Sequence, residues 1–411
     1  MKDMNRFFSF LLSQRERAAR AVPWLGLLIF ALTGTLGVFL GGSYASLGIG
    51  GGLLLFGAVW MADGRAPKPH GVLAGFCFFF LLVCAALDLQ AMDKWLAWKE
   101  TLRLATILLP LLLLSCPAVQ ARAAQADVFK YAAIAAALGM FALGAELFSG
   151  TPLLKWMNGS GVFDEKAVTK YNRGFSYAVL LSWPFMASLW AEPKRRWTVA
   201  PFFLVMLLPL TLTLSRATQL GFVMAAVVFA AALLAPVVVR WGLGLLAVLA
   251  TAWPFVAQAM FDNYLEGIAR LPSSWKARME IWDFMSYRIL ERPWLGWGLG
   301  SSHELQPLSP HSASYVVTTG PVSHPHNAFT QLWVELGLPG LALGVFFALF
   351  MLRLAGRVQK KRVPFALAAW TMAFALAMVA YDFWTDSLLA AFALTAFAFA
   401  LLERKTARTN S

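Results

Sequence analysis

The chain has 411 residues, of which 59% are hydrophobic and 13% are charged, whereas soluble domains carry about 25% charged residues. This composition excludes an ordinary soluble enzyme and predicts an all-α polytopic membrane protein, because helices satisfy their own backbone hydrogen bonds inside lipid. The formal net charge is +13. A balance this basic can indicate a nucleic-acid partner, but membrane topology accounts for it here, and we expect no nucleic-acid binding.

Apolar segments long enough to cross a bilayer recur along the chain. One crossing needs about 20 apolar residues, and somewhat fewer where neighbouring helices shield the span. The first apolar run is too long for the core of a cleaved signal peptide, so we expect it to remain as the first span. The sequence predicts about twelve transmembrane helices, at residues 22–40, 44–61, 71–88, 101–117, 128–149, 174–191, 197–214, 216–239, 241–260, 338–356, 363–381 and 386–402.

The distribution of charge predicts the orientation of these spans. Twelve crossings leave both termini on one side, which holds 21 of the 34 basic residues but only 6 of the 21 acidic residues. The positive-inside rule makes that side the cytoplasm. The predicted organisation is therefore spans one to nine in residues 1–260, a long outer loop region in 261–337, and spans ten to twelve with a cytoplasmic tail in 338–411. A shorter outer segment covers residues 150–173.

Two arginines stand at the outer ends of predicted spans. Arg216 precedes a long apolar run, where a charge costs roughly a few kcal/mol unless it has a partner. The partner is either a structural carboxylate, Glu146 or Asp386, or a negatively charged substrate. Arg173 lies at the outer end of the sixth span, where it is either an interfacial anchor or a second group for the same substrate.

The long outer region begins with a predicted helix over residues 272–293, bounded by prolines near both ends. One face of this helix carries an apolar stripe with a charge at its rim, formed by Arg278, Trp282, Met285 and Ile289. Arg278 either contacts lipid phosphate or points into a site. The glycines at 296, 298 and 300 then indicate a flexible turn, which is not a dinucleotide-binding fingerprint because no strand precedes it.

Four of the five histidines lie between residues 303 and 326, namely His303, His311, His324 and His326. A short helix is predicted from His326-Asn327 to Leu336, followed by a turn at 337–340 into span ten. The helix dipole disfavours a charged ring at its N-terminus, so a neutral His326 could accept a proton as a general base, or else simply cap the helix. His324 precedes a proline, which favours a structural role. Glu335 is the second candidate base, or it orients His326 or pairs with an arginine.

Three arginines directed at one outer site would suit a pyrophosphate. Arginine stays charged and binds phosphate oxygens through a bidentate fork, which lysine does not provide. The chain contains no Asp-x-Asp motif, the usual pairing for a metal-bridged nucleotide sugar. These features point away from a nucleotide donor and toward a lipid pyrophosphate.

At this point the motifs resemble those of a known family. His326-Asn327, nine further residues and then Gly337-x-x-Gly340 resembles the signature of the WaaL-type O-antigen ligases and the related O-antigen polymerases. Arg278-x-x-x-Trp282 and the segment 292–298 are similar to the preceding part of that pattern. Ser215-Arg216 resembles the arginine that begins a span in the family. Specific motifs cover only residues 172–221 and 274–340.

The resemblance implies a GT-C-like membrane glycosyltransferase that needs no metal or other cofactor. Members transfer a glycan from undecaprenyl pyrophosphate to lipid A–core at the periplasmic face of the bacterial inner membrane. Carried onto this chain, it makes His326 the catalytic base and Arg216 and Arg278 the essential arginines. We assign a surrounding substrate-binding role to Arg173, Asn327, Glu335, Trp282 and His324. The expected partners are the lipid-linked donor, the lipid A–core acceptor and membrane lipids, and we expect a monomer.

Three alternatives remain beside a ligase. An O-antigen polymerase and a protein oligosaccharyltransferase belong to the same superfamily, and the histidine motif does not separate them from ligases. A flippase for lipid-linked oligosaccharides belongs to another class and should carry charge through the whole depth of the bilayer. Here the charges at the membrane edge gather at the outer face, which favours an enzyme.

Overall fold

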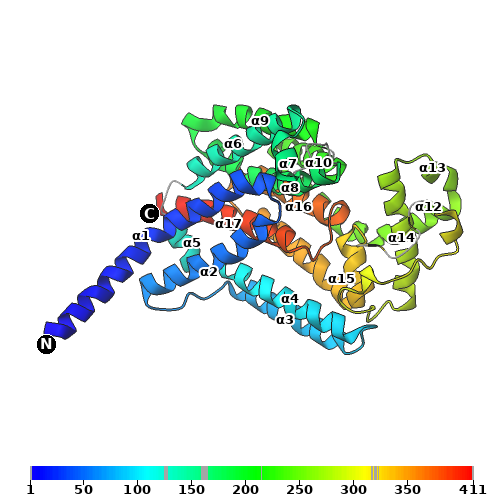
Figure 1. Ribbon diagram of the computed structural model, residues 1–411, viewed down its shortest axis with the longest axis horizontal. Coiled ribbons are helices and arrows are strands. Elements are labelled where there is room, and N and C mark those ends of the chain that lie inside the picture. Colours follow the sequence, from blue (N-terminus) through cyan, green and yellow to red (C-terminus); the bar gives the residue numbers. More distant parts are fainter. Residues whose placement is uncertain are drawn as a thin grey trace.

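The computed structural model describes residues 2–124, 128–158, 165–213, 215–315, 318, 322 and 324–409. Within these ranges the chain forms helices and connecting loops without any β-strand, as predicted (Figure 1). Part of the predicted outer segment 150–173 and part of the loop region 261–337 lie outside the described residues. The chain is a multi-pass membrane protein of the all-α class.

The first half of the chain contains eight helices in the described residues: α1 (Lys2–Phe39), α2 (Ser43–Asp63), α3 (Gly71–Asp88), α4 (Lys94–Leu113), α5 (Pro117–Ala123), α6 (Val128–Phe148), α7 (Pro152–Asn158) and α8 (Glu165–Ala191). The second half continues with α9 (Val199–Leu212), α10 (Arg216–Leu234), α11 (Pro236–Leu249), α12 (Trp253–Asn263), α13 (Leu265–Ala269), α14 (Ser273–Glu291), α15 (Ala328–Ala355), α16 (Val363–Val379) and α17 (Asp386–Thr409). Short 3-10 helices occupy residues 193–198, 250–252, 301–303, 312–314 and 360–362.

The number of spans is slightly lower than predicted. Among the described residues, ten helices are long and apolar enough to cross a membrane, or eleven if α4 and α5, bent by 56° to each other, form one span. The predicted sixth span, residues 174–191, lies in α8 and is not among them. Serine, tyrosine, tryptophan and proline interrupt its apolar residues, which lowers its mean hydropathy.

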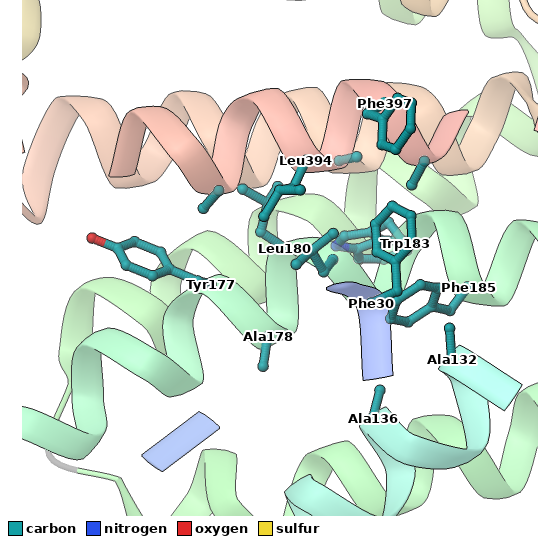
Figure 2. Packing of buried hydrophobic residues seen from close by; sticks show 14 of the residues in the cluster. Phe30, Ala132, Ala136, Tyr177, Ala178, Leu180, Trp183, Phe185, Leu394 and Phe397 are labelled. Atoms are coloured by element: carbon teal, nitrogen blue, oxygen red, sulfur yellow. The ribbon is translucent and has the colours of Figure 1, made fainter. Parts of the chain in front are cut away.

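The position of α8 explains this composition, because other helices surround it. Phe30 of α1 lies between Phe185 of α8 and Phe397 of α17, with ring centroids 6.0 and 5.9 Å away (Figure 2). Small residues allow α1 and α6 to approach closely, since a Cβ on Gly139 would lie 2.0 Å from the carbonyl oxygen of Gly34. A helix that meets protein rather than lipid can carry polar side chains at little cost.

Helix α15 breaks where the sequence predicts a turn. Gly337 has φ 63° and ψ −160°, and Pro339 cannot donate a backbone hydrogen bond. The segment 328–336 is therefore the predicted short helix, and the remainder of α15 is span ten. A side chain at Gly337 is excluded, because its Cβ would lie 2.3 Å from the carbonyl oxygen of Trp294.

The glycine turn at 296–300, predicted to be flexible, is instead packed against this break. Trp297 N donates to Val334 O at 2.9 Å, and Gly298 N donates to Glu335 O at 2.8 Å. These bonds replace the helical partners that the break removes from the two carbonyl groups. The prediction of flexibility was wrong because the turn pairs with a segment that is distant in sequence.

Helices α12, α13 and α14 form a lobe that extends to one side of the bundle (Figure 1). The predicted helix over 272–293 is α14, and its predicted apolar stripe is buried through Trp282, Met285 and Ile289. Phe261 of α12 belongs to the same apolar cluster. Arg278 lies half-buried at the rim of the stripe, as predicted, on the side where the lobe meets the bundle.

Candidate active site

Four consecutive residues, from Val379 at the end of α16 to Asp382, collect the charged groups of the candidate site. They end or directly follow a mostly buried helix, so their backbone is fixed relative to the bundle. The groups that they hold come from α8, α14 and two stretches of the outer loop. The four residues contact, in order, Arg278, His326, Arg173 and His303.

The contacts of His326 determine which of its nitrogens carries the proton. Its Nδ1 lies 3.3 Å from the carbonyl oxygen of Ala380 and 3.0 Å from Nε2 of His324. A carbonyl oxygen only accepts hydrogen bonds, so the contact with Ala380 favours a proton on Nδ1. Nε2 of His326 is then left with its lone pair, the form that a general base requires.

The surroundings keep both paired histidines neutral. Burial lowers the pKa of His326 to about 3, assisted by His324 and the Arg278 guanidinium. Burial likewise lowers the pKa of His324 to about 4, assisted by the positive charges of His303, Arg278 and Arg173. Desolvation is therefore the main reason that the ring of His326 is neutral, whereas the sequence analysis attributed a neutral ring to the helix dipole.

The backbone at His326 is also unusual. Its φ is 52°, a value that non-glycine residues rarely adopt, and this conformation turns the chain from the loop into α15. Asn327 caps the helix, with its side-chain oxygen accepting from Thr330 N at 3.0 Å. Trp282 of α14 donates its indole N–H to Pro325 O at 2.8 Å. Asn327 and Trp282, both predicted to bind substrate, are instead buried and hold the turn that presents His326.

The position of Glu335 does not match a base, a partner of His326 or a partner of an arginine. Its side chain is completely buried, and its partners among the described residues include neither His326 nor an arginine. Both carboxylate oxygens accept hydrogen bonds that join the glycine turn, α15 and the start of α17. The donors are Gly300 N at 3.0 Å, Ser302 Oγ at 2.5 Å, Trp384 Nε1 at 2.7 Å and Gln331 Nε2 at 3.2 Å. Glu335 thus fixes the scaffold beneath the site.

The charge of Arg278 acts on both rings of the histidine pair. Its Nε donates to Val379 O at 3.1 Å and its Nη1 donates to Ser274 O at 2.7 Å. These contacts engage two of its five N–H groups and fix the plane of the guanidinium. Burial lowers the pKa of Arg278 from its ordinary value, which still leaves the group charged near neutral pH.

Among the described residues, Arg173 contacts the Val379–Asp382 segment, whereas Arg216 does not. The Arg173 guanidinium lies 5.7 Å from the centre of the Tyr381 ring, and its charge reaches His324. Arg216 is the exposed first residue of α10 and donates to Gln219 Oε1 at 2.9 Å. Its charge is not among the main influences on the two histidines. The structure therefore brings Arg173 and Arg278 together with His326 and leaves Arg216 at the edge.

The structural partners considered for Arg216 are occupied by other groups. Glu146 accepts from the backbone N–H groups of Leu153 and Leu154, at 3.1 and 2.9 Å. Asp386 pairs with Arg103 of α4. Neither carboxylate pairs with Arg216 in the part of the chain that the structure describes, which leaves the exposed guanidinium available to a ligand.

Sequence reasoning missed the Val379–Asp382 segment and gave His303 no role. A local signal existed, because Asp382 is a carboxylate in a short outer connection between two apolar helices. The contacts themselves join segments that lie 54 or more residues apart. No local pattern encodes such pairings.

Part of this chain is similar to a known protein family. Residues 201–345 match the model of the family described as O-antigen ligase. This match confirms the predicted resemblance to the O-antigen ligase superfamily. The matched residues include Arg216, Arg278 and His326, whereas Arg173 and the Val379–Asp382 segment lie outside them.

Two curated proteins are similar to about half of this chain. A protein named "Putative polysaccharide ligase RC0486" from Rickettsia conorii is 27% identical over 227 residues, which cover 53% of this chain and 54% of the relative. A protein named "Putative polysaccharide ligase" from Rickettsia felis is 26% identical over 219 residues, which cover 52% of this chain and 53% of the relative. The chain spans about half the length of the curated relatives that it matches.

Proposed function

We propose that this protein is an O-antigen ligase that transfers a glycan from undecaprenyl pyrophosphate to lipid A–core. The observation that carries the proposal is the contact of His326 Nδ1 with Ala380 O, which favours a lone pair on Nε2. The charge of Arg278 acts on this base, and both residues lie in the part of the chain that matches the O-antigen ligase family. A base next to a fixed cation is what transfer from a lipid pyrophosphate to a sugar hydroxyl requires.

The proposed reaction is a single displacement. Nε2 of His326 takes the proton of an acceptor hydroxyl, and the oxygen attacks the anomeric carbon of the first donor sugar. The bond from that carbon to the pyrophosphate oxygen breaks, and its electron pair leaves with undecaprenyl pyrophosphate. Attack from the side opposite the leaving group inverts the configuration at the anomeric carbon.

Arginines stabilise the charge that grows on the leaving group. Arg278 and Arg173 lie on the histidine side of the site, and Arg216 stands at its edge with an exposed guanidinium. Fixed positive groups aimed at developing charge supply the largest part of catalysis in many transfers. Because guanidinium groups can neutralise a pyrophosphate without a metal ion, we propose that the reaction is metal-independent.

We further propose that the site faces the periplasm and that both termini are cytoplasmic, in the inner membrane. The excess of basic residues on the predicted cytoplasmic side supports this orientation. The candidate site lies between the lobe and the bundle, on groups that all belong to the predicted outer side. Labelling of single cysteines in the lobe and at the termini, with a reagent that does not cross membranes, tests the orientation.

Reconstitution tests the proposed function directly. Purified protein in liposomes receives lipid-linked donor and lipid A–core, with and without chelator, and the glycosylated lipid is measured. We expect transfer in both conditions and inversion at the new linkage. His326→Ala should abolish it, whereas His70→Ala, which alters an exposed histidine at the start of α3, should not. Loss of transfer on chelation contradicts the arginine model.

The same preparation separates the alternative functions. A polymerase would elongate one lipid-linked repeat with another in the absence of lipid A–core, and a protein oligosaccharyltransferase would require a polypeptide acceptor. A flippase would move the lipid-linked glycan across the vesicle membrane with no acceptor present. Any of these outcomes without transfer to lipid A–core overturns the ligase assignment.

A further inference from the structure

His303 is a histidine near the site that the reaction above does not use. It ends the short 3-10 helix 301–303, directly after the packed glycine turn. Its Nε2 lies 3.5 Å from Oδ2 of Asp382, the last residue of the segment that holds the site. The His303 side chain is 43% exposed while that of Asp382 is 21% exposed, so the ring is accessible and its carboxylate partner is more protected.

Asp382 is held rigidly in this arrangement. Its Oδ1 accepts from Gln331 Nε2 at 2.8 Å and from Trp384 N at 3.0 Å. These bonds fix the carboxylate plane and leave Oδ2 directed at His303. The bond to Nε2 then orients the ring, and no partner for Nδ1 occurs among the residues that the structure describes. Nδ1 is the nitrogen through which His303 can bind a ligand.

The charges around His303 oppose those around the histidine pair. The hydrogen bond to Asp382 raises the pKa of His303, and the negative charges of Asp382, Glu335 and Glu100 add to that rise. Burial and neighbouring cations lower the pKa of His324 and His326. Adjacent titratable groups whose environments drive their pKa values apart commonly divide acid and base roles.

Three positive groups also contact the Val379–Asp382 segment. His303, Arg278 and Arg173 come from the outer loop, α14 and α8, and the charge of each one lowers the pKa of His324. Groups from three separate segments thus lie within electrostatic range of a single imidazole. An anion bound next to His324 would be attracted by all three.

On the basis of the proposed ligase function, we propose that His303 binds the pyrophosphate of the donor as an imidazolium, through a charge-assisted hydrogen bond from Nδ1. Asp382 accepts the hydrogen bond of Nε2–H, so an anionic ligand at Nδ1 requires a second proton there and hence the doubly protonated ring. His303 is then a titratable member of the leaving-group site beside two arginines that do not titrate.

This role predicts a loss of transfer on the alkaline side. The pKa of His303 is raised in the folded protein, so the charged ring is present below that pKa and disappears as the pH increases through it. The rate of transfer per enzyme should fall over the same interval, through a higher KM for the donor. The arginines keep their charge there and cannot cause the fall.

Three variants in the reconstituted full-length protein test the proposal. His303→Gln should raise the KM for the donor by about 10-fold or more at neutral pH, since one charge-assisted hydrogen bond is lost, and should remove the alkaline fall. His303→Arg should restore the donor KM and also lack the alkaline fall, because the new cation does not titrate. Asp382→Asn should move the fall to lower pH. His70→Gln is the matched control.

The outcomes separate this proposal from the ligase assignment. If the wild type transfers no glycan to lipid A–core, the proposed function fails. If it does transfer but His303→Gln keeps the wild-type donor KM and alkaline fall, only the role of His303 fails. Equal losses in His303→Gln and His303→Arg overturn it as well, because they indicate a structural role.

A measurement without turnover guards against misfolded variants. The chain has five histidines, so nitrogen-15 labelling of histidine gives few signals to assign by substitution. Inorganic pyrophosphate should raise the pKa of His303 in the wild type, because an anion bound to the charged ring favours protonation. It should have less effect in Arg278→Gln. An unchanged titration of His303 in saturating pyrophosphate overturns the proposal.

Discussion

Two histidine environments in the outer region show opposite uses of the same side chain. His326 faces a carbonyl oxygen and a second imidazole, which leaves one ring nitrogen with a lone pair. His311, in the lobe, has both ring nitrogens engaged by carboxylates. Its Nδ1 lies 3.1 Å from Asp283 and its Nε2 lies 3.1 Å from Asp262. The first ring can react with a substrate, and the second joins α12 to α14.

The partners of each ring, rather than its place in a cluster, therefore decide its role. Asp283 is completely buried and also accepts from Ser309 and Tyr315, so the whole set around His311 stabilises the lobe. The set around His326 includes Arg278 and a strained backbone, features that occur at sites of chemistry more often than in scaffolds. Four predictions follow from this difference in partners.

The largest effect should come from removing the base. His326→Ala is expected to reduce kcat for glycan transfer by about 100-fold to 10,000-fold, the usual contribution of a general base. The thermal unfolding temperature in detergent should stay close to that of the wild type, because the ring caps no helix. Activity of this variant within a few-fold of wild type would remove His326 from the chemistry.

A smaller loss of activity is expected when Arg278 is replaced by lysine, which has the same charge but a different shape. Arg278→Lys keeps the charge but loses the fork that binds Val379 O and a phosphate together, so we expect about a 10-fold to 100-fold fall in kcat/KM. Lys276→Arg, on the same helix, is the matched control. Equal activity of Arg278→Lys and wild type would show that charge alone is sufficient.

His324 should matter less than His326, and in a way that depends on the replacement. His324→Gln can still accept the Nδ1 proton of His326 through its amide oxygen, whereas His324→Ala cannot. We expect about a 10-fold lower kcat for alanine and a milder loss for glutamine, since one orienting hydrogen bond is worth roughly 1 kcal/mol. Steady-state kinetics of the two variants measure the difference. Identical losses would mean that His324 only fills space.

The smallest effect on transfer should come from the lobe. His311→Gln is expected to leave kcat within about 2-fold of wild type and to destabilise the protein by roughly 1–3 kcal/mol, because buried Asp283 loses a partner. Thermal unfolding followed by tryptophan fluorescence, together with the transfer assay, measures both quantities. A catalytic loss as large as that of His326→Ala would contradict the contrast between the two rings.

The acid side of the pH profile adds a separate test of His326. A pKa of about 3 for His326 and about 4 for His324 keeps both rings neutral as the pH falls through the ordinary histidine value of about 6.5. The neutral form is the active one, so kcat should persist between about pH 7 and pH 5. A kcat that halves near the ordinary histidine pKa would show that His326 is not shielded in this way.

The sequence predicted those parts of the fold that local chemistry encodes. The limits of α14 follow from its prolines, and the break in α15 follows from Gly337 and Pro339. The position of His326 at the start of α15 follows from the same signals. The predicted span at 174–191 does not reach the length and hydropathy that mark the other spans, and the sequence alone does not show that other helices enclose α8.

The candidate site was predictable in its components and not in its assembly. His326 and Arg278 were found as residue types that phosphate chemistry needs. Trp282 and Glu335 were predicted to contact substrate. The structure buries both side chains, and burial is a tertiary property that no spacing reveals. The Val379–Asp382 segment was missed for the same reason, since ordinary loop residues hold the site through backbone oxygens and one carboxylate.

The exchange of hydrogen bonds at Gly337 has a mechanical consequence. Residues 328–336 are tied to the glycine turn and the scaffold around Glu335, while the remainder of α15 lies among the membrane helices. Spans tilt when bilayer thickness changes, and a continuous helix would carry that tilt to its outer end. We expect the break to reduce the share of that tilt that reaches the ring of His326. A lipid-embedded enzyme can in this way keep a constant working geometry in membranes of different thickness.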